Sequence, residues 1–407
     1  MTYNAMRMKT IYLDNGASTM VDPKVVKAMQ PYFSEIYGNA SSTHEMGALA
    51  KRALSDARHT IAKSIGAKDS EIIFTSGGTE SNNMVLKGLA FACADLPVLK
   101  GTAELNVNVN KNHIITTKIE HSCVLNSCKW LSEHGFEVTY LDVDDEGFVR
   151  LGDLEKAIRP ETFLISIIHG NNEIGTVQDL KELGKICRKA GVLFHTDACQ
   201  SFTKVQIDVE KIGVDLMTLN SHKIHGPKGI GALYVRSGIE MVPLMHGGGH
   251  EKGRRAGTEN VAGIVGFAEA VRLGLKGGHV KDMVKMRDFF IREVLSRVEG
   301  VKLNGPIDEG SGERRLCNNM NFAFPVNGEM LGDYLNMAGI CTSKGSACSA
   351  NEGESVSHVL KAIGRTDKEA ENSIRFTLSR FTTREELEEA LKILIKSVEK
   401  VSGSRWV

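Results

Sequence analysis

Seven strand-like segments restrict the fold of this chain more than any other feature. They begin at Glu71, His113, Glu137, Phe163, Val192, Asp215 and Gly231. Most are separated by segments with helical spacing of apolar residues, the alternation typical of βαβ units in a parallel sheet. Only six residues separate Lys223 from Ile230, too few for a parallel crossover, which needs about a dozen. The sequence therefore predicts an α/β fold with a mostly parallel seven-stranded sheet and one reversed strand.

The chain has 407 residues, enough for two domains. Near its carboxyl end, short strand-like runs at residues 318–324 and 373–379 alternate with helical patterns. This pattern favours a smaller α+β domain. We expect a large cofactor-binding domain over residues 20–275 and a small domain formed by residues 1–19 and 276–407.

Composition excludes several classes of protein. Fifty basic residues balance fifty acidic ones, so we expect neither nucleic acid nor a membrane surface as a direct partner. No apolar run has membrane-spanning length and the first residues lack a signal-peptide core, which predicts a cytoplasmic protein. The eight cysteines form no CxxC pair, so they are expected to be reduced thiols rather than zinc ligands.

A lysine marks the first candidate for chemistry. Lys223 lies in LNSHKIHGPKG, residues 219–229, where an apolar run gives way to turn residues. Open α/β sheets bind ligands at the carboxyl ends of their strands, and a lysine there can form a Schiff base with pyridoxal phosphate. Alone, the pattern is more typical of a surface lysine beside a turn.

A second stretch, SGGTESNN at residues 76–83, follows a strand and opens a helix. Gly77 and Gly78 leave backbone amides uncovered, and Thr79 and Ser81 add hydroxyl donors, which together favour a phosphate cradle. A plain capped helix start is the alternative. The stretch lacks both GK[ST] and GxGxxG, which argues against a nucleotide-binding protein.

Three polar residues complete the predicted cofactor site. Asp197 ends a strand 26 residues before Lys223, so adjacent parallel strands would bring both side chains to one edge of the sheet. A carboxylate there can keep a pyridinium nitrogen protonated. Gln200 could bind the phenolic oxygen of the ring, and His121 could lie against the ring and shuttle protons. Each residue alone is more typical of a structural role.

The carboxy-terminal part offers a nucleophile and an anion-binding arginine. Cys348 lies among small polar residues in GSACSANEGESVSH, residues 345–358. This indicates either an exposed thiol in a surface loop or a nucleophile on a mobile arm. Arg375, in a strand-like run, could bind a carboxylate with two hydrogen bonds, and Arg380 is the competing candidate.

These residues resemble the cysteine desulfurases of the NifS and IscS type, which are pyridoxal phosphate enzymes of the class V aminotransferase family. The resemblance covers nearly the whole chain, in the family's order and spacing, through YLDNGAST, GNASSTH, FTSGGTESNN, KIEHSCVL, NNEIGTVQD, HTDACQS, SHKIHGPKG, GGGHEKGRRAGT, GSAC and SIRFTLSRFTT. It implies the type I (aspartate aminotransferase-like) fold and a homodimer with active sites at the subunit interface.

The resemblance also implies roles for individual residues. Lys223 matches the Schiff-base lysine, Cys348 the sulfur-accepting cysteine and Arg375 the arginine that binds the substrate carboxylate. His121 matches the histidine stacked on the ring, and Thr258 a threonine that reaches the phosphate of the neighbouring subunit's cofactor. Other cofactor contacts match Gly78, Thr79, Asn172, Asp197, Gln200, Asn220 and His222, and Asn172 also faces the substrate.

The activity implied is the removal of sulfur from L-cysteine, which yields L-alanine and a persulfide on Cys348. The sulfur would pass to a scaffold protein of the IscU type for iron-sulfur cluster assembly, or to another acceptor. The same resemblance implies that Cys348 can share a transient [2Fe-2S] cluster with a scaffold. Asn220 and Ser221 depart from the Ser and Gly of many relatives, and the loop after Cys348 is unusual in detail.

Two other hypotheses remain open at this stage. One is another enzyme of the same fold, such as a selenocysteine lyase or a cysteine lyase. The other is a scaffold or regulator without catalysis, against which the joint presence of Lys223, Asp197 and Cys348 argues. The sequence does not identify the sulfur acceptor, and residues 95–111 resemble an enlarged surface connection.

Overall fold

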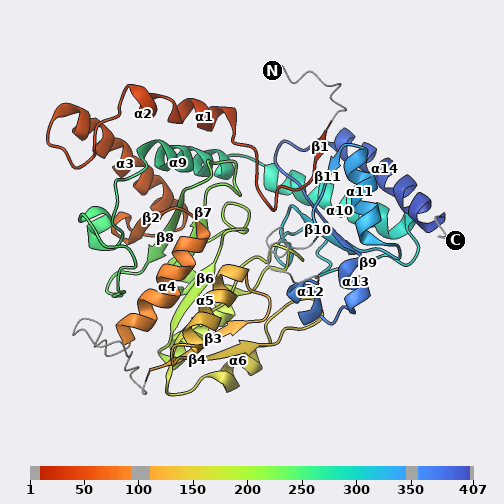
Figure 1. Ribbon diagram of the computed structural model, residues 1–407, viewed down its shortest axis with the longest axis horizontal. Helices are drawn as coiled ribbons and strands as arrows, with labels where there is room; N and C mark the ends of the chain where they lie inside the picture. The colour runs from red at the N-terminus through yellow and green to blue at the C-terminus, as the bar shows by residue number, and fades with distance from the viewer. Residues whose placement is uncertain (1–9, 94–110, 345–355, 404–407) are drawn as a thin grey trace.

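The computed structural model describes residues 10–93, 111–344 and 356–403. A large α/β part and a smaller part lie side by side, and β1 and α14, near the two ends of the chain, both belong to the smaller part (Figure 1). The strands are β1 (Ile11–Tyr12), β2 (Ile72–Thr75), β3 (His113–Thr117), β4 (Glu137–Leu141), β5 (Thr162–Ser166), β6 (Leu193–Asp197), β7 (Leu216–Asn220), β8 (Gly231–Val235), β9 (Lys302–Leu303), β10 (Asn319–Ala323), β11 (Ile340–Cys341) and β12 (Ser373–Thr377).

The helices include long amphipathic ones and several of a single turn. They are α1 (Pro23–Met29), α2 (Pro31–Ser34), α3 (Glu45–Ser64), α4 (Gly78–Cys93), α5 (Ser122–Ser132), α6 (Leu151–Ala157), α7 (Leu180–Ala190), α8 (Val209–Ile212), α9 (Val261–Leu275), α10 (His279–Arg297), α11 (Gly328–Met337), α12 (His358–Ala362), α13 (Asp367–Glu371) and α14 (Arg384–Gly403). No helix in the described ranges is both long enough and apolar enough to cross a membrane.

The large sheet has seven strands in the order β2-β8-β7-β6-β5-β3-β4. Strand β8 runs antiparallel to both of its neighbours, β7 and β2, while the other pairings are parallel. The predicted sheet, with its single reversed strand, is therefore confirmed. The short connection after Lys223 explains the reversal, because it has no room for a crossover helix.

Strands β2, β3, β5, β7 and β8 are buried at every position, so helices cover the sheet on both faces. Successive residues of a strand point to opposite faces. Ile72 and Phe74 belong to the core cluster that also contains residues of α3, α7 and α9, whereas Ile73 packs with α4 and α5. Covering helices on both sides leave the carboxyl edge of the parallel strands as the place for a site.

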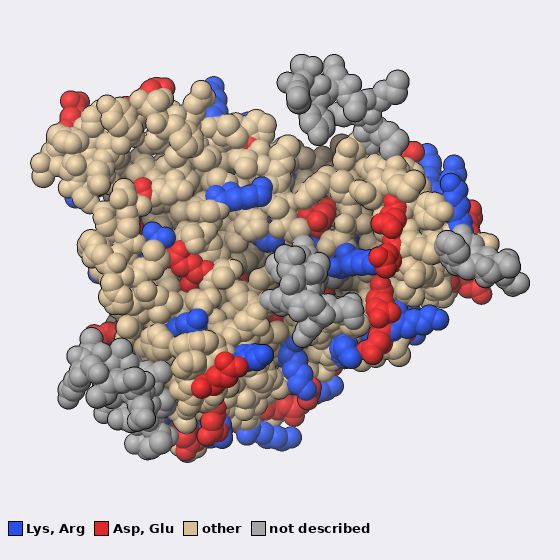
Figure 2. All heavy atoms as spheres, in the orientation of Figure 1, with Lys and Arg blue, Asp and Glu red and all other residues tan. Residues whose placement is uncertain are grey.

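The smaller part contains a three-stranded sheet, β12-β10-β9, and the parallel pair β1-β11. Its core joins Ile11 and Leu13 to residues between 283 and 401, so residues near the two ends of the chain pack together. Helix α12 contributes Val359 and Leu360 to the core of the large sheet instead. The exact domain boundaries stay a prediction. On the face in Figure 2, charged side chains of both signs are interspersed.

Candidate active site

A cavity of about 500 Å³ opens at the carboxyl edge of the sheet. It gathers residues from the segment before α1, from the turns after β2, β6 and β7, from the N-terminus of α5, and from β12. The predicted site residues that line it are Gly78, Thr79, His121, Asn172, Asp197, Gln200, Asn220, His222, Lys223 and Arg375. Segments as far apart in sequence as those of Gly16 and Arg375 thus meet here, and most of them end at the carboxyl edge of the sheet, where ligands bind in open α/β folds.

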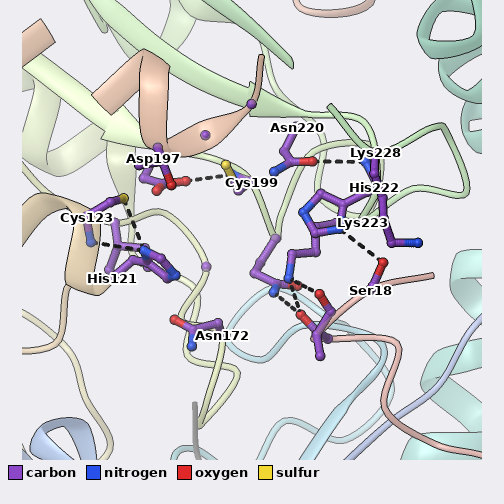
Figure 3. Close-up of a pocket in the computed structure, with 18 of the residues that line it drawn as sticks. Ser18, His121, Cys123, Asn172, Asp197, Cys199, Asn220, His222, Lys223 and Lys228 are labelled. Atoms are coloured by element: carbon purple, nitrogen blue, oxygen red, sulfur yellow. Dashed lines mark hydrogen bonds between the residues drawn. The ribbon is translucent and has the colours of Figure 1, made fainter. Parts of the chain in front are cut away.

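Lys223 extends from the turn after β7 towards the start of the chain (Figure 3). Its Nζ donates hydrogen bonds to the carbonyl oxygens of Gly16, at 2.5 Å, and Ala17, at 2.7 Å. The neighbouring His222 Nδ1 lies 3.2 Å from Ser18 Oγ. Backbone carbonyls of the amino-terminal segment therefore hold the amine within the cavity.

Asp197 ends β6 and is 5% exposed. Its Oδ2 accepts a hydrogen bond of 2.7 Å from Asn82 Nδ2, and its Oδ1 accepts one of 2.9 Å from the backbone N–H of Cys199. These two donors fix the orientation of the buried carboxylate. In Figure 3, Asp197 and Lys223 lie on different sides of the cavity.

The turn between β2 and α4 forms the candidate anion site. The N-terminus of a helix presents unpaired N–H groups and a positive dipole end, and α4 begins at Gly78. A Cβ on Gly78 would lie 2.7 Å from Cys199 Sγ, so only glycine fits there without a shift of that thiol. The N–H of Ser76 donates to Glu80 Oε2 at 2.8 Å, which fixes the path of the turn.

Thr258 does not line this cavity. It lines an adjoining cavity of about 160 Å³, and Ser76 and Gly229 line both. Arg255, three residues earlier, donates to Glu80 through Nε at 2.8 Å and Nη2 at 3.3 Å. This ion pair ties the loop that contains Thr258 to the turn at the start of α4.

His121 and His222 are held in different ways. His121 is the N-cap of α5, where its Nδ1 accepts from the N–H of Cys123. The N–H of His222 donates to Asn220 Oδ1 at 2.9 Å. Burial and the nearby ammonium of Lys223 lower the pKa of His222 to about 4, so its imidazole is neutral at physiological pH.

The structure distinguishes the two candidate arginines. Arg375 lines the cavity, is 2% exposed, and donates to the Asn172 carbonyl oxygen at 2.9 Å and to Asp14 Oδ1 at 3.0 Å. Arg380 instead donates to Asp22 Oδ2 at 2.5 Å, next to the start of α1. Of the two, only Arg375 is placed to meet a ligand in the cavity.

Cys348 lies outside the described residues, so its expected roles as sulfur acceptor and cluster ligand are not tested by the structure. The cysteines in the described ranges are free thiols. Burial raises the pKa of each of them, Cys93, Cys123, Cys128, Cys187, Cys199, Cys317 and Cys341. No group of three or more potential metal ligands occurs in the described part of the chain.

Sequence reasoning missed several cavity residues, including Ser18, Cys123, Cys199 and Lys228. Two of them could have been predicted from their neighbours in the sequence, because Cys199 lies between Asp197 and Gln200, and Cys123 is two residues after His121. Ser18 comes from the turn after β1, whose approach to the site nothing in the local pattern indicates.

The cavity suits pyridoxal 5'-phosphate by its chemistry. The anion site at the start of α4 matches a phosphate, the amine of Lys223 matches an aldehyde, and the buried carboxylate of Asp197 matches a pyridinium nitrogen. Its volume lies within the range of small-molecule sites, about 300–1,000 Å³.

Comparison with known proteins identifies the family. The model of the family described as aminotransferase class-V matches residues 11–390. A protein of Dictyoglomus turgidum named cysteine desulfurase IscS is 46% identical over 396 residues, which cover 97% of this chain and 95% of that protein. One of Methanosarcina thermophila with the same name is 45% identical, with coverage of 97% and 93%.

Solved structures agree. A NifS-like protein, 36% identical, superposes with a TM-score of 0.85 and covers 96% of this chain and 100% of its own. A structure described as SspA in complex with cysteine, 38% identical, has a TM-score of 0.78 and covers 92% and 100%. The chain therefore belongs to the pyridoxal phosphate-dependent class V aminotransferase family, among the cysteine desulfurases of the NifS and IscS type.

Proposed function

We propose that this protein is a cysteine desulfurase, which removes the sulfur of L-cysteine, releases L-alanine and holds the sulfur on Cys348. The observation that supports the proposal most is the convergence of Lys223, Asp197, His121 and Arg375 on one cavity. Curated relatives over 97% of the chain are named cysteine desulfurase, and one solved relative is described as a complex with cysteine.

Pyridoxal 5'-phosphate would be held by contacts to its ring and to its phosphate, and by a covalent bond to Lys223. Lys223 would form the Schiff base, Asp197 would supply the charge for the ring nitrogen, and Gln200 would supply a hydrogen bond to the phenolic oxygen. Gly78, Thr79, Asn220 and His222, which line the cavity, would provide the phosphate and other cofactor contacts. When bound, the cofactor withdraws electrons from the α-carbon of an amino acid and so makes its proton acidic.

Arg375 and Asn172 would orient the substrate. The guanidinium of Arg375 already neutralises Asp14, and its Nε is buried without a partner among the described residues, so it retains a donor for a carboxylate. With the carboxylate fixed there, the α-proton lies within the cavity that contains Lys223 and His121. The amine and imidazole are the groups that would move protons at the α-carbon and at the departing sulfur.

Cys348 would then take the sulfur. Its thiolate attacks the sulfur of the substrate, a sulfur–sulfur bond forms, and the carbon–sulfur bond breaks with its electron pair left on carbon. That carbon gains a proton, so the products are L-alanine and a persulfide on Cys348. Cys123 and Cys199 line the cavity within the described part of the chain, and their raised pKa values make them poor nucleophiles compared with a thiolate.

The persulfide sulfur would pass to an acceptor, and the IscS names of the relatives favour a role in iron-sulfur cluster assembly. The acceptor that we propose is a scaffold protein of the IscU type. A transient [2Fe-2S] cluster shared through Cys348 belongs to the same proposal. We place the protein in the cytoplasm, because the described cysteines are free thiols.

We further propose a homodimer in which Thr258 reaches the cofactor phosphate of the other subunit. Thr258 lies beside, not in, the cavity of its own chain. Exposed apolar side chains on and around α1 and α2, namely Val26, Phe33 and Tyr37, offer surface for such a contact. Sedimentation of the purified protein tests this proposal, and a monomer that retains full activity contradicts it.

The experiment for the proposed function measures alanine and sulfide released from L-cysteine in the presence of a reducing thiol. We expect both products in equal amounts from the wild type and almost none from Cys348→Ala at the same cofactor content. Release of selenide from selenocysteine by Cys348→Ala at the wild-type rate would favour a selenocysteine lyase instead.

A further inference from the structure

Cys123 contacts the imidazole of the proposed acid–base histidine. Its Sγ lies 3.1 Å from His121 Nδ1, and its backbone N–H donates to the same nitrogen at 3.2 Å. Figure 3 shows both contacts at the edge of the cavity. Because a backbone N–H can only donate, Nδ1 must offer its lone pair, and the thiol must therefore donate as well.

The thiol is held in this position from its other side. Asn82, which is fully buried on α4, donates through Nδ2 to Cys123 Sγ at 3.1 Å and to Asp197 Oδ2 at 2.7 Å. A hydrogen-bonded path thus runs from the carboxylate of Asp197 through Asn82 and Cys123 to His121. Burial, with Asp197 nearby, raises the pKa of the Cys123 thiol to about 12, so its proton is retained at neutral pH.

We propose that Cys123 is a positioning residue, which fixes His121 in the tautomer with its proton on Nε2. Two donors directed at Nδ1 disfavour a proton on that nitrogen. The single exchangeable proton of the neutral imidazole is then carried by the other nitrogen, so His121 acts towards the cavity as a donor. The role in turnover rests on the proposed function, whereas the tautomer does not.

Nitrogen NMR of the full-length, cofactor-loaded protein with ¹⁵N-labelled histidine tests the proposal, since the shift of each ring nitrogen reports whether it is protonated. The signals of His121 are those lost in His121→Gln. We compare wild type with Cys123→Ala, Cys123→Val and Cys123→Ser, because serine can restore the donor and valine keeps the side-chain volume. Cys128→Ala is the matched control, because Cys128 lies on the same helix within an apolar cluster.

We expect the Nε2–H form in wild type, Cys123→Ser and Cys128→Ala. In Cys123→Ala and Cys123→Val the ratio of Nε2–H to Nδ1–H should fall about fivefold, the effect of one ordinary hydrogen bond. Alanine formation should fall by a similar factor in these two variants and recover in Cys123→Ser. An unchanged tautomer ratio in both apolar variants, or a serine variant that behaves like them, overturns the proposal. If the wild type forms no sulfide, the proposed function is wrong but the proposal for Cys123 is still tested, because NMR measures the tautomer without turnover.

Discussion

Arg375 and Asp14, which are 361 positions apart in the chain, form a hydrogen-bonded ion pair at 3.0 Å beside the cavity. The same amino-terminal segment supplies the two carbonyl oxygens that bind Lys223. One wall of the site therefore depends on the docking of residues 14–17 against β12 and the turn after β7. One carboxylate and one carbonyl partner fix the orientation of this buried arginine.

Arg375→Lys should lower kcat/KM for L-cysteine about 100-fold, mainly through a higher KM, because lysine cannot offer the same pair of parallel donors to a carboxylate. Steady-state kinetics over a range of L-cysteine concentrations measure the effect. Arg380→Lys is the matched control, since that arginine binds Asp22 outside the cavity. If Arg380→Lys raises KM as much as Arg375→Lys, the assignment of the carboxylate site is wrong.

The architecture of the sheet could be predicted from the sequence. The contacts between distant segments around the site could not. Asp197 and Lys223 could be placed together because each follows an apolar run, and adjacent parallel strands end at one edge. The strands β6 and β7 do pair in parallel, with Asp197 opposite Thr218. The length of the last connection was enough to predict the reversal of β8.

Contacts made by irregular segments leave no local pattern. Glu80, in the first turn of α4, and Arg255, in a loop, are 175 positions apart, and no periodic pattern of residues indicates their contact. The sequence motif identified the loop with Thr258 but not its link to the start of α4. The contact of Lys223 with Gly16 and Ala17 could not be predicted either, because the hydrogen-bond acceptors are backbone carbonyl oxygens, which any residue would supply.

Glu80 and Arg255 should be needed for retention of the cofactor. Arg255→Gln removes the ion pair that fixes Glu80, which in turn binds the N–H of Ser76 in the proposed phosphate turn. We expect the dissociation constant of pyridoxal 5'-phosphate to rise about tenfold, equivalent to about 1.4 kcal/mol. Titration of the cofactor-free protein by absorbance measures it. Arg254→Gln removes the same charge from the adjacent position, and an equal loss in that variant would refute the specific role of Arg255.

Gly78→Ala should also weaken cofactor binding, because its Cβ would lie 2.7 Å from Cys199 Sγ. The clash should displace the thiol or the turn. The double variant Gly78→Ala/Cys199→Ala removes the sulfur and should recover most of the affinity, so the two substitutions are coupled. A double-mutant cycle on cofactor affinity measures the coupling, and additive losses would show that the contact is not what requires glycine.

Glu120 should make the protein less stable as pH rises. Its carboxyl is 1% exposed, and burial raises its pKa to about 8. Above its unfolded pKa of 4.5 the unfolded chain releases a proton that the folded chain keeps, so the free energy of unfolding falls until pH passes about 8. Glu120→Gln removes this pH dependence. Between pH 5 and 8 the free energy of unfolding of the variant should therefore rise relative to that of the wild type by up to about 1.4 kcal/mol per pH unit.

Urea unfolding of both proteins at several pH values measures that difference. Thr117 Oγ1 and the N–H of Ile168 donate to Glu120 Oε1, and glutamine can accept both bonds. A wild type and a Glu120→Gln variant whose stabilities change in parallel with pH would mean that Glu120 is ionised in the folded protein.

The most direct test of the account is where the sulfur goes. The cofactor-loaded protein is treated with one equivalent of L-cysteine without a reducing thiol and is then digested with a protease. Mass spectrometry measures the masses of the peptides that contain cysteine. We expect one added sulfur atom on the peptide that contains Cys348, one alanine released for each added sulfur, and no addition at Cys123 or Cys199. Alanine formation with the added sulfur on Cys123 or Cys199, and none on Cys348, would contradict it.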